Sequence, residues 1–382
     1  MYQARDLPRP DPRVPHLADV TPSVLAAMGA SGFEPRIALP YQAAGACVLL
    51  VDGLGADLLD RYAVDAPVLA GLSRQTLQVG FPSTTAAGLA AVGTGCRSGE
   101  HGMVGMTFRL PEVGVINALR WRPHPWGADL REDVVPEVVQ PRPTVFERAE
   151  AGGVQVSVIS GAQFDGSGLT RAVLRGGRYR GVHALGDLAA TVRSVLIDRG
   201  FCYAYHADLD LVGHVHGPGS DAWRMQLRQV DTLVESILDG MPPGGLLAVV
   251  ADHGMVAVEE SAVIDIDATE SLTEGVAEIG GEVRARHLYV RDGALEDVLA
   301  TWHEVVGERA WVTSGDDAVA AGWFGERVTD PVRARIGDVV VAARVTAGFL
   351  RRSAEPVESS LIGQHGSLTD AEQKIPLLLG SR

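Results

Sequence analysis

The chain of 382 residues has almost no lysine, little cysteine and few aromatic residues. Its single lysine, Lys374, follows a glutamine, so the Gly-Lys-Ser/Thr core of a phosphate-binding P-loop cannot form. The three cysteines include no Cys-x-x-Cys pair, which disfavours a disulfide framework and a cysteine-rich zinc site. Carboxylates, hydroxyls and imidazoles are therefore the groups left to carry chemistry.

Long apolar runs and an excess of positive charge are also missing. Hydrophobic residues make up 46% of the sequence, yet no run approaches the ~18 residues that a bilayer-spanning helix needs. Residues 1–19 lack the apolar stretch of a secretory signal. The net charge of −15 argues against a nucleic-acid polymer or a membrane surface as a partner. We expect a soluble, cytoplasmic protein that acts on a small molecule, and its oligomeric state stays open.

Short apolar runs recur along the chain and alternate with helical segments. Runs of this kind, followed by aspartate or glycine, are typical of strands buried on both faces of a sheet. The pattern predicts an α/β fold with a mostly parallel central sheet and helices on both faces. The expected strands are residues 46–51, 154–159, 201–205, 246–251 and 375–379, and the clearest expected helices are 56–72, 187–196 and 220–239.

Three stretches depart from this alternation. Proline-rich residues 1–40 predict an extended N-terminal arm with one short helix near 23–28. Residues 41–382 are expected to form a single catalytic domain. Within it, residues of about 97–143 and 266–344 are interpreted as insertions that form loops or a cap around the site, the second with strands near 287–290 and 338–341.

The polar residues that follow the expected strands are rich in metal-ligand types. In open α/β sheets, ligands bind beyond the carboxyl ends of the strands. Carboxylates and neutral imidazoles hold zinc and similar divalent ions where thiolates are absent. Each residue alone is more simply explained as a cap, a strand end or an ordinary histidine, but their coincidence at four strand ends predicts a site with enough ligands for two ions. The candidates are Asp52, Asp208, Asp210, His214, His216, Asp252, His253 and His365.

A hydroxyl-rich turn, Ser83-Thr84-Thr85, precedes a helix of small residues. The free N–H groups and the positive dipole end of such a helix suit a phosphoryl oxygen. The simpler interpretation is that Ser83 or Thr84 caps the helix. Because three hydroxyls are available, the turn can hold both a cap and a nucleophile.

Six motifs of the chain stand in the order seen in the alkaline phosphatase superfamily. Over about residues 46–379 the chain is most similar to the type I phosphodiesterase/nucleotide pyrophosphatase branch. The resemblance implies a phosphoric ester hydrolase that cleaves phosphodiester or pyrophosphate bonds of a small soluble substrate. The motifs are Asp-Gly-Leu-Gly at 52–55, Phe-Pro-Ser-Thr-Thr at 81–85, the stretch 94–102, the stretch 210–218, Ala-Asp-His-Gly-Met at 251–255 and His-Gly at 365–366.

The same resemblance assigns roles to seven residues. It implies that Asp210, His214 and His365 hold one divalent ion, where the Asp-x-x-x-His spacing selects Asp210 over Asp208 and leaves His216 without a counterpart. Thr85 is the implied nucleophile, because it stands third after the proline of Phe-Pro. Two ions, expected to be Zn²⁺, would lower the pKa of its hydroxyl, and a covalent phosphothreonine would form before water releases the phosphate. The implied ligands of the other ion are Asp52, Asp252, His253 and Thr85.

Departures from the family pattern bear on the substrate. No Cys/Ser-x-Pro-x-Arg context surrounds Thr85, which disfavours a sulfatase. Ala86 stands where phosphomonoesterases of the superfamily carry arginine, which favours a phosphodiester monoanion. Met106 stands where nucleotide pyrophosphatases carry an asparagine that donates to a phosphoryl oxygen, so the group that replaces this donor is open.

Two alternative functions follow from these departures. One is a phosphomonoesterase or phosphonate hydrolase that uses the same metal centre. The other is a non-catalytic metal-binding module. For the leaving group, Phe108, Trp121 and Trp126 could stack on a nucleobase, although aromatic residues in proline-rich loops are more often packing anchors.

Overall fold

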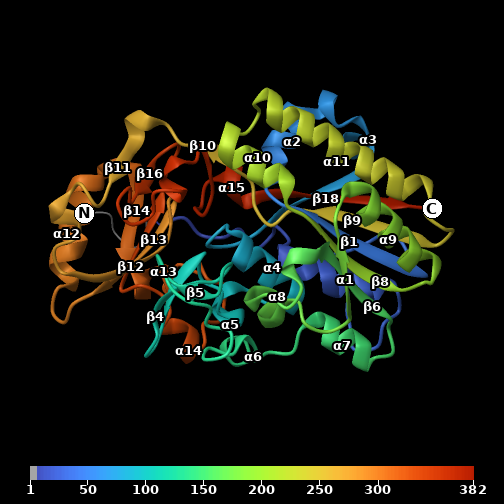
Figure 1. Cartoon of the computed structure of the whole chain (residues 1–382), viewed down its shortest axis with the longest axis horizontal. Coiled ribbons are helices and arrows are strands. Elements are labelled where there is room, and N and C mark those ends of the chain that lie inside the picture. Colours follow the sequence, from blue (N-terminus) through green and yellow to red (C-terminus); the bar gives the residue numbers. More distant parts are fainter. Residues whose placement is uncertain (1–6) are drawn as a thin grey trace.

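A seven-stranded sheet with helices on both faces forms the larger part of the computed structural model, which describes residues 7–382 (Figure 1). The strand order is β2-β18-β9-β1-β8-β6-β7. β1 pairs in parallel with β8 and β9, and β6 pairs in parallel with β7 and β8, whereas β18 is antiparallel to both neighbours. The expected α/β fold with a mostly parallel sheet is confirmed. The strands are β1 (Gly45–Val51), β2 (Ser73–Gln78), β6 (Val156–Gly161), β7 (Arg178–Val182), β8 (Phe201–His206), β9 (Gly245–Val250) and β18 (Lys374–Ser381).

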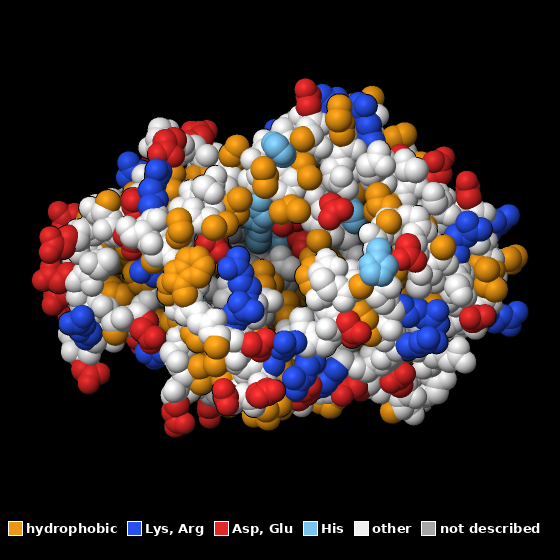
Figure 2. Space-filling view, viewed as in Figure 1, with side chains coloured by type: hydrophobic (Ala, Val, Ile, Leu, Met, Phe, Trp, Pro, Cys, Tyr) orange, Lys and Arg blue, Asp and Glu red, His pale blue; other side chains and the backbone are white. Residues whose placement is uncertain are grey.

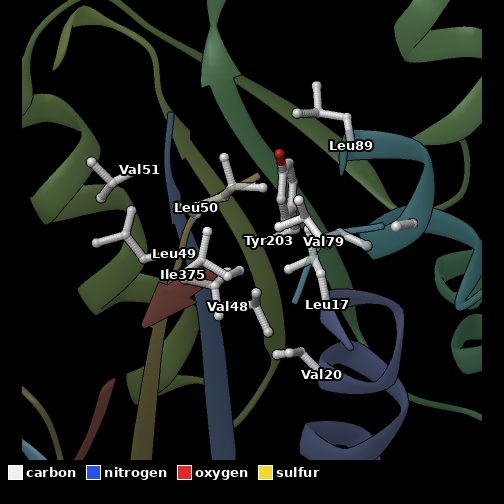
Figure 3. Close-up of a cluster of buried hydrophobic side chains, with 14 of the residues drawn as sticks. Leu17, Val20, Val48, Leu49, Leu50, Val51, Val79, Leu89, Tyr203 and Ile375 are labelled. Atoms are coloured by element: carbon white, nitrogen blue, oxygen red, sulfur yellow. The ribbon is translucent and has the colours of Figure 1, made fainter. Parts of the chain in front are cut away.

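The central strands are apolar along their whole length because both of their faces are covered. Every residue of β1 and of β9 is buried. A continuous apolar run rather than an alternating one is what a strand between two helical layers requires. Figure 3 shows side chains of β1 among residues from β8, β18 and the N-terminal segment, including Tyr203, Ile375, Leu17 and Val20.

The helices around this sheet follow the expected positions with one exception. The exception is the helix expected at 56–72, which is split into α2 (Ala56–Arg61), a 3₁₀ turn (Ala63–Asp65) and α3 (Pro67–Gly71). Pro67 lacks an N–H and disfavours helical backbone at Ala66, so a continuous helix cannot pass this point. The other helices near the sheet are α4 (Thr85–Thr94), α7 (Val145–Ala151), α8 (Gly168–Val173), α9 (Leu185–Ile197), α10 (Asp208–His216), α11 (Asp221–Asp239) and α15 (Asp370–Gln373).

The N-terminal segment is less extended than its proline content predicts. From residue 7 onward it holds a 3₁₀ turn (Leu17–Asp19) and α1 (Val20–Ala27), which begins before the expected 23–28. Leu17 and Val24 are fully buried in the main core. Apolar side chains of this segment therefore pack with the large sheet.

Residues of the stretch 266–344 form most of a second, smaller unit at the left of Figure 1. Its four-stranded antiparallel sheet has the order β12-β13-β15-β14, and α12 (Leu295–Val306) packs on it over a separate core around Trp302. The strands are β12 (Val276–Glu282), β13 (Ala285–Val290), β14 (Ala310–Ser314) and β15 (Val339–Ala343), so the strands expected near 287–290 and 338–341 are present. Nearby are β11 (Val263–Asp265), β16 (Gly348–Leu350), α13 (Gly315–Ala320) and α14 (Asp330–Arg333).

The stretch 97–143 is more regular than a loop. It contains a three-stranded sheet of β3 (Thr107–Leu110), β4 (Gly114–Asn117) and β5 (Arg122–Pro123), which contacts β12 of the smaller unit. Two short helices, α5 (Ser98–His101) and α6 (Pro136–Val139), precede and follow these strands in the chain. A separate antiparallel pair is formed by β10 (Val256–Ala257) and β17 (Gly363–Gln364). Within residues 7–382, no helix is both long and apolar enough to cross a membrane.

Candidate metal centre

The candidate ligands come from five segments that meet near the carboxyl ends of β1 and β9. Asp52 directly follows β1, and its N–H donates to the His206 carbonyl at 2.9 Å. Asp252 and His253 follow β9, and the helical spacing within α10 puts Asp210 and His214 one turn apart. The remaining two residues are Thr85, the first residue of α4, and His365, which directly follows β17.

One group of side chains surrounds the hydroxyl of Thr85. Its Oγ1 lies 3.3 Å from His253 Nε2. The same nitrogen is 3.3 Å from Asp52 Oδ1 and 3.6 Å from Asp252 Oδ2. The implied nucleophile and the three ligands that the resemblance places with it are thus in mutual contact.

The second group adjoins the first. His214 Nε2 lies 3.2 Å from Asp210 Oδ2 and 3.3 Å from His365 Nε2. The rings of His253 and His365 stack with centroids 3.5 Å apart, so all seven residues singled out in the sequence come together. In Figure 2, histidine and acidic side chains gather in a hollow between the two parts of the molecule.

Two sets of atoms are close enough to hold an ion each. One set is Asp210, His214 and His365, as the resemblance implies. The other is Asp52, Asp210 and His253, so Asp210 belongs to both sets rather than to one. A carboxylate can offer one oxygen to each of two neighbouring ions, and two-metal sites with ions ~3.5 to 4 Å apart use this arrangement.

The chemistry of the donor atoms fits divalent cations. Three buried carboxylate oxygens of the site, on Asp52, Asp210 and Asp252, have no hydrogen-bond partner in the part of the chain that the structure describes. Buried unpaired oxygens are costly unless a cation neutralises them. The histidines are oriented in turn by Nδ1–H groups that donate to backbone carbonyls, which leaves each Nε2 lone pair for a metal. These bonds are His214 to Gly363 (2.6 Å), His253 to Gly254 (3.0 Å) and His365 to Ser83 (2.9 Å).

Without an ion, bound protons offset part of the negative charge of the carboxylates in this cluster. Burial, followed by the charge of Asp52, raises the pKa of Asp252 well above its usual value. Burial alone would lower the pKa of His253, but Asp252 and Asp52 outweigh it and raise the pKa to about 10. Burial would also raise the pKa of Asp210, yet His214 holds it below the usual range. A dication at the same place would displace these protons.

Thr84 is the N-cap residue of α4, as one interpretation of the turn expected, but its side chain makes no hydrogen bond to the helix. The Ser83 hydroxyl instead donates to the Ser367 carbonyl at 2.8 Å and accepts from Gly366 N–H at 3.2 Å. The first N–H groups of α4 therefore stay open for an anion beside Thr85.

Two further residues of the site were missed in the sequence. The Tyr205 hydroxyl, at the end of β8, donates to Asp52 Oδ2. As a polar residue at the end of an expected strand, Tyr205 could have been found by the rule that identified the ligands. Glu282, the last residue of β12, accepts the Met106 N–H at 2.9 Å, and its other oxygen is buried without a hydrogen-bond partner among residues 7–382. Its stretch of sequence carries no motif.

The backbone N–H of Met106 does not replace the asparagine donor of the family. It is bound to Glu282 and is not free for substrate. Burial raises the pKa of Glu282 to about 7, although the Met106 N–H and the Thr84 hydroxyl lower it. The smaller unit thus contributes a carboxyl group beside the turn that precedes α4.

The remaining candidates fall outside the centre. Asp208 and His216 are exposed on α10. Phe108 and Trp121 are fully buried, so neither can stack on a substrate ring. Trp126, in contrast, is 68% exposed.

Comparisons with known proteins show the family of this chain. The chain matches the family described as type I phosphodiesterase / nucleotide pyrophosphatase over residues 46–368. Phosphopentomutase from Anaeromyxobacter dehalogenans (strain 2CP-C) is 31% identical over 175 residues, which are 45% of this chain and 41% of that protein. The match thus spans about two fifths of the length of that relative.

Two solved structures share the fold at low sequence identity. Murine ectonucleotide pyrophosphatase / phosphodiesterase 5 superposes with a TM-score of 0.67 and 15% identity over 88% of each chain. Phosphonoacetate hydrolase from Sinorhizobium meliloti 1021, in complex with phosphonoformate, gives 0.66 and 18% over 88% of this chain and 90% of that one. Together with the family match over most of the sequence, these findings show that the chain belongs to the type I phosphodiesterase/nucleotide pyrophosphatase family and has an alkaline-phosphatase-like fold.

Proposed function

We propose that the chain is a metal-dependent hydrolase that cleaves phosphodiester or pyrophosphate bonds of a small substrate through a phosphothreonine at Thr85. The observation that carries this proposal is the Thr85 hydroxyl, 3.3 Å from His253 Nε2 within the converged ligand set. A threonine hydroxyl is a weak nucleophile by itself and needs an adjacent base or a metal to act. This centre supplies such a setting.

Two divalent ions, expected to be Zn²⁺, would be held by the seven residues named above. When bound, they supply positive charge that lowers the pKa of the hydroxyl and neutralises phosphoryl oxygens. The open N–H groups of α4 bind a phosphoryl oxygen. Thr85 Oγ1 attacks phosphorus, the bond to the leaving oxygen breaks as the new bond forms, and water then cleaves the phosphothreonine and restores Thr85.

The surroundings of Thr85 support a diester or pyrophosphate substrate over a monoester. A monoester dianion carries one more negative oxygen and needs an extra cationic or amide donor. Ala86 offers no charge, and the Met106 N–H is already bound to Glu282. The carboxyl group of Glu282 nearby further disfavours a dianion.

The first experiment combines metal content with turnover. Elemental analysis should find two zinc ions per chain, and initial rates should favour bis-p-nitrophenyl phosphate over p-nitrophenyl phosphate. Thr85→Ala should lower the rate by about 10³-fold or more, as removal of a catalytic nucleophile does. Thr94→Ala is the matched control, because this hydroxyl lies at the far end of α4 and donates to the Ala90 carbonyl.

Each other outcome selects another function. A preference for the monoester, or turnover of a phosphonate, moves the assignment to a phosphomonoesterase or phosphonate hydrolase with the same centre. Two bound ions without turnover of any ester indicate a metal-binding module. A protein without bound metal contradicts the ligand assignment itself.

A further inference from the structure

A small cavity of about 100 Å³ lies between β5 and the segment 354–358. A chain of backbone and side-chain hydrogen bonds connects this cavity to the metal centre. Glu282 binds the Met106 N–H, and the Met106 carbonyl accepts the Ala118 N–H at 2.8 Å. Asn117, the residue before Ala118, lines the cavity. Hydrogen bonds through Met106 thus link the wall of this cavity to Glu282, the carboxyl group beside the turn that carries Thr85.

The cavity carries positive charge in a chain whose net charge is −15. Arg120 and Arg122 line it, and Glu358 is the only acidic residue of its lining. Arg120 approaches Glu358 at 3.9 Å. Within residues 7–382, Arg122 forms no direct ion pair, although its charge acts on the nearby carboxylate of Asp129, so its guanidinium N–H groups remain able to bind an anion.

One wall of the cavity presents an unusually open aromatic ring. Trp126 is 68% exposed, whereas tryptophan is mostly buried in folded proteins. The segment that carries it is held firmly, because the buried His124 ring lies 2.9 Å from Glu355, which Arg286 binds in turn at 2.7 Å. Figure 2 shows cationic and apolar side chains together beside the histidine-lined hollow, on the side of β5.

We propose that this cavity is the leaving-group subsite and takes a planar group that bears a negative charge. Arg122 binds the charge, and the ring of Trp126 stacks on the planar group. Both are specificity-determining residues, and neither takes part in bond cleavage. The inference rests on the proposed function, since a leaving group exists only if the centre cleaves an ester.

Two substrates that differ by one carboxylate test this assignment. They are the methyl phosphodiesters of phenol and of 4-hydroxybenzoate, or the corresponding monoesters if the enzyme prefers those. Wild type should favour the carboxylate ester in kcat/KM by about tenfold, as one charge-assisted hydrogen bond at a half-open site allows. Arg122→Ala should abolish this preference, whereas Arg122→Lys should keep part of it.

Replacing Trp126 separates the contribution of ring stacking to binding from the contribution of the Arg122 charge. Trp126→Ala should lower kcat/KM for both esters by a similar factor, mainly through KM. Arg178→Ala is the matched control, because Arg178 is an exposed arginine on β7 at the edge of the large sheet. An equal preference in wild type and Arg122→Ala would overturn the subsite.

A binding measurement keeps this test independent of turnover. Calorimetry with 4-hydroxybenzoate on the metal-loaded Thr85→Ala protein should show binding that the added Arg122→Ala change removes. If wild type hydrolyses neither ester but this binding is seen, the proposed function fails and the anion site stands. If both esters are hydrolysed and binding is the same with and without Arg122, the function stands and the subsite is wrong.

Discussion

Replacing Tyr205 with phenylalanine removes a single hydroxyl group that orients a proposed metal ligand. This hydroxyl donates to Asp52 Oδ2, while Asp52 Oδ1 faces His253 Nε2 at 3.3 Å. Asp52 is only 2% exposed, so water cannot replace the lost donor without rearrangement. Without Tyr205, the carboxylate can turn and one more buried oxygen is left unpaired.

The size of the effect follows from this geometry. Outer partners of metal ligands typically contribute about 10- to 100-fold to metal affinity, which corresponds to roughly 1.4 to 2.8 kcal/mol. We therefore expect the dissociation constant of the ion at Asp52 to rise by that factor in Tyr205→Phe. The ion at His214 and His365 should be affected less, since these two imidazoles are oriented by the Gly363 and Ser83 carbonyls, whereas the Tyr205 hydroxyl binds Asp52.

The assay is competition with a chromophoric zinc chelator at fixed pH and ionic strength, followed by elemental analysis of the separated protein. Tyr179→Phe is the control, because it removes the same group from β7, where the hydroxyl donates to the Gly161 carbonyl at 2.8 Å. That variant should bind both ions as wild type does. Equal affinities of wild type and Tyr205→Phe would refute the positioning argument.

Three further predictions concern the same part of the fold. Across the described residues 7–382, the Tyr203 hydroxyl (Figure 3) is buried without a hydrogen-bond partner. Tyr203→Phe should therefore leave the unfolding free energy unchanged or raise it by up to about 1 kcal/mol in denaturant titrations, and a clear loss would contradict the structure. In Gly88→Ala the new methyl group would lie 2.3 Å from Asp252 Cβ. We therefore expect the unfolding free energy to fall by about 1 to 3 kcal/mol and elemental analysis to find less zinc. Retention of both ions would show that α4 can move away from Asp252. In the metal-free protein the pKa of His253 is raised to about 10 from 6.5, so its contribution to stability is complete below pH 6.5 and is lost as the pH rises toward 10. The thermal midpoint of the metal-free protein should thus fall between pH 6.5 and 9, and that of the zinc-loaded protein should fall less, because a metal-bound imidazole is already neutral.

Much of the centre was predictable because its residues stand beside recognisable local patterns. Asp52 and Asp252 directly follow apolar runs, and such runs predict buried strands whose carboxyl ends meet at one edge of a sheet. Asp210 and His214 are four residues apart, which places them on one face of a helix. Pattern and spacing act over a few residues, so they can be read without knowledge of the folded chain.

The tertiary structure alone decided which distant segments meet. Glu282 reaches Met106 across 176 residues of sequence, and no local pattern marks either residue as a partner of the other. Trp121 and Trp126 stand five residues apart in the same proline-rich stretch, yet one is fully buried and the other 68% exposed. Burial and long-range contact depend on how sheets and loops pack, whereas the ligand types and the order of the motifs were determined by the sequence itself.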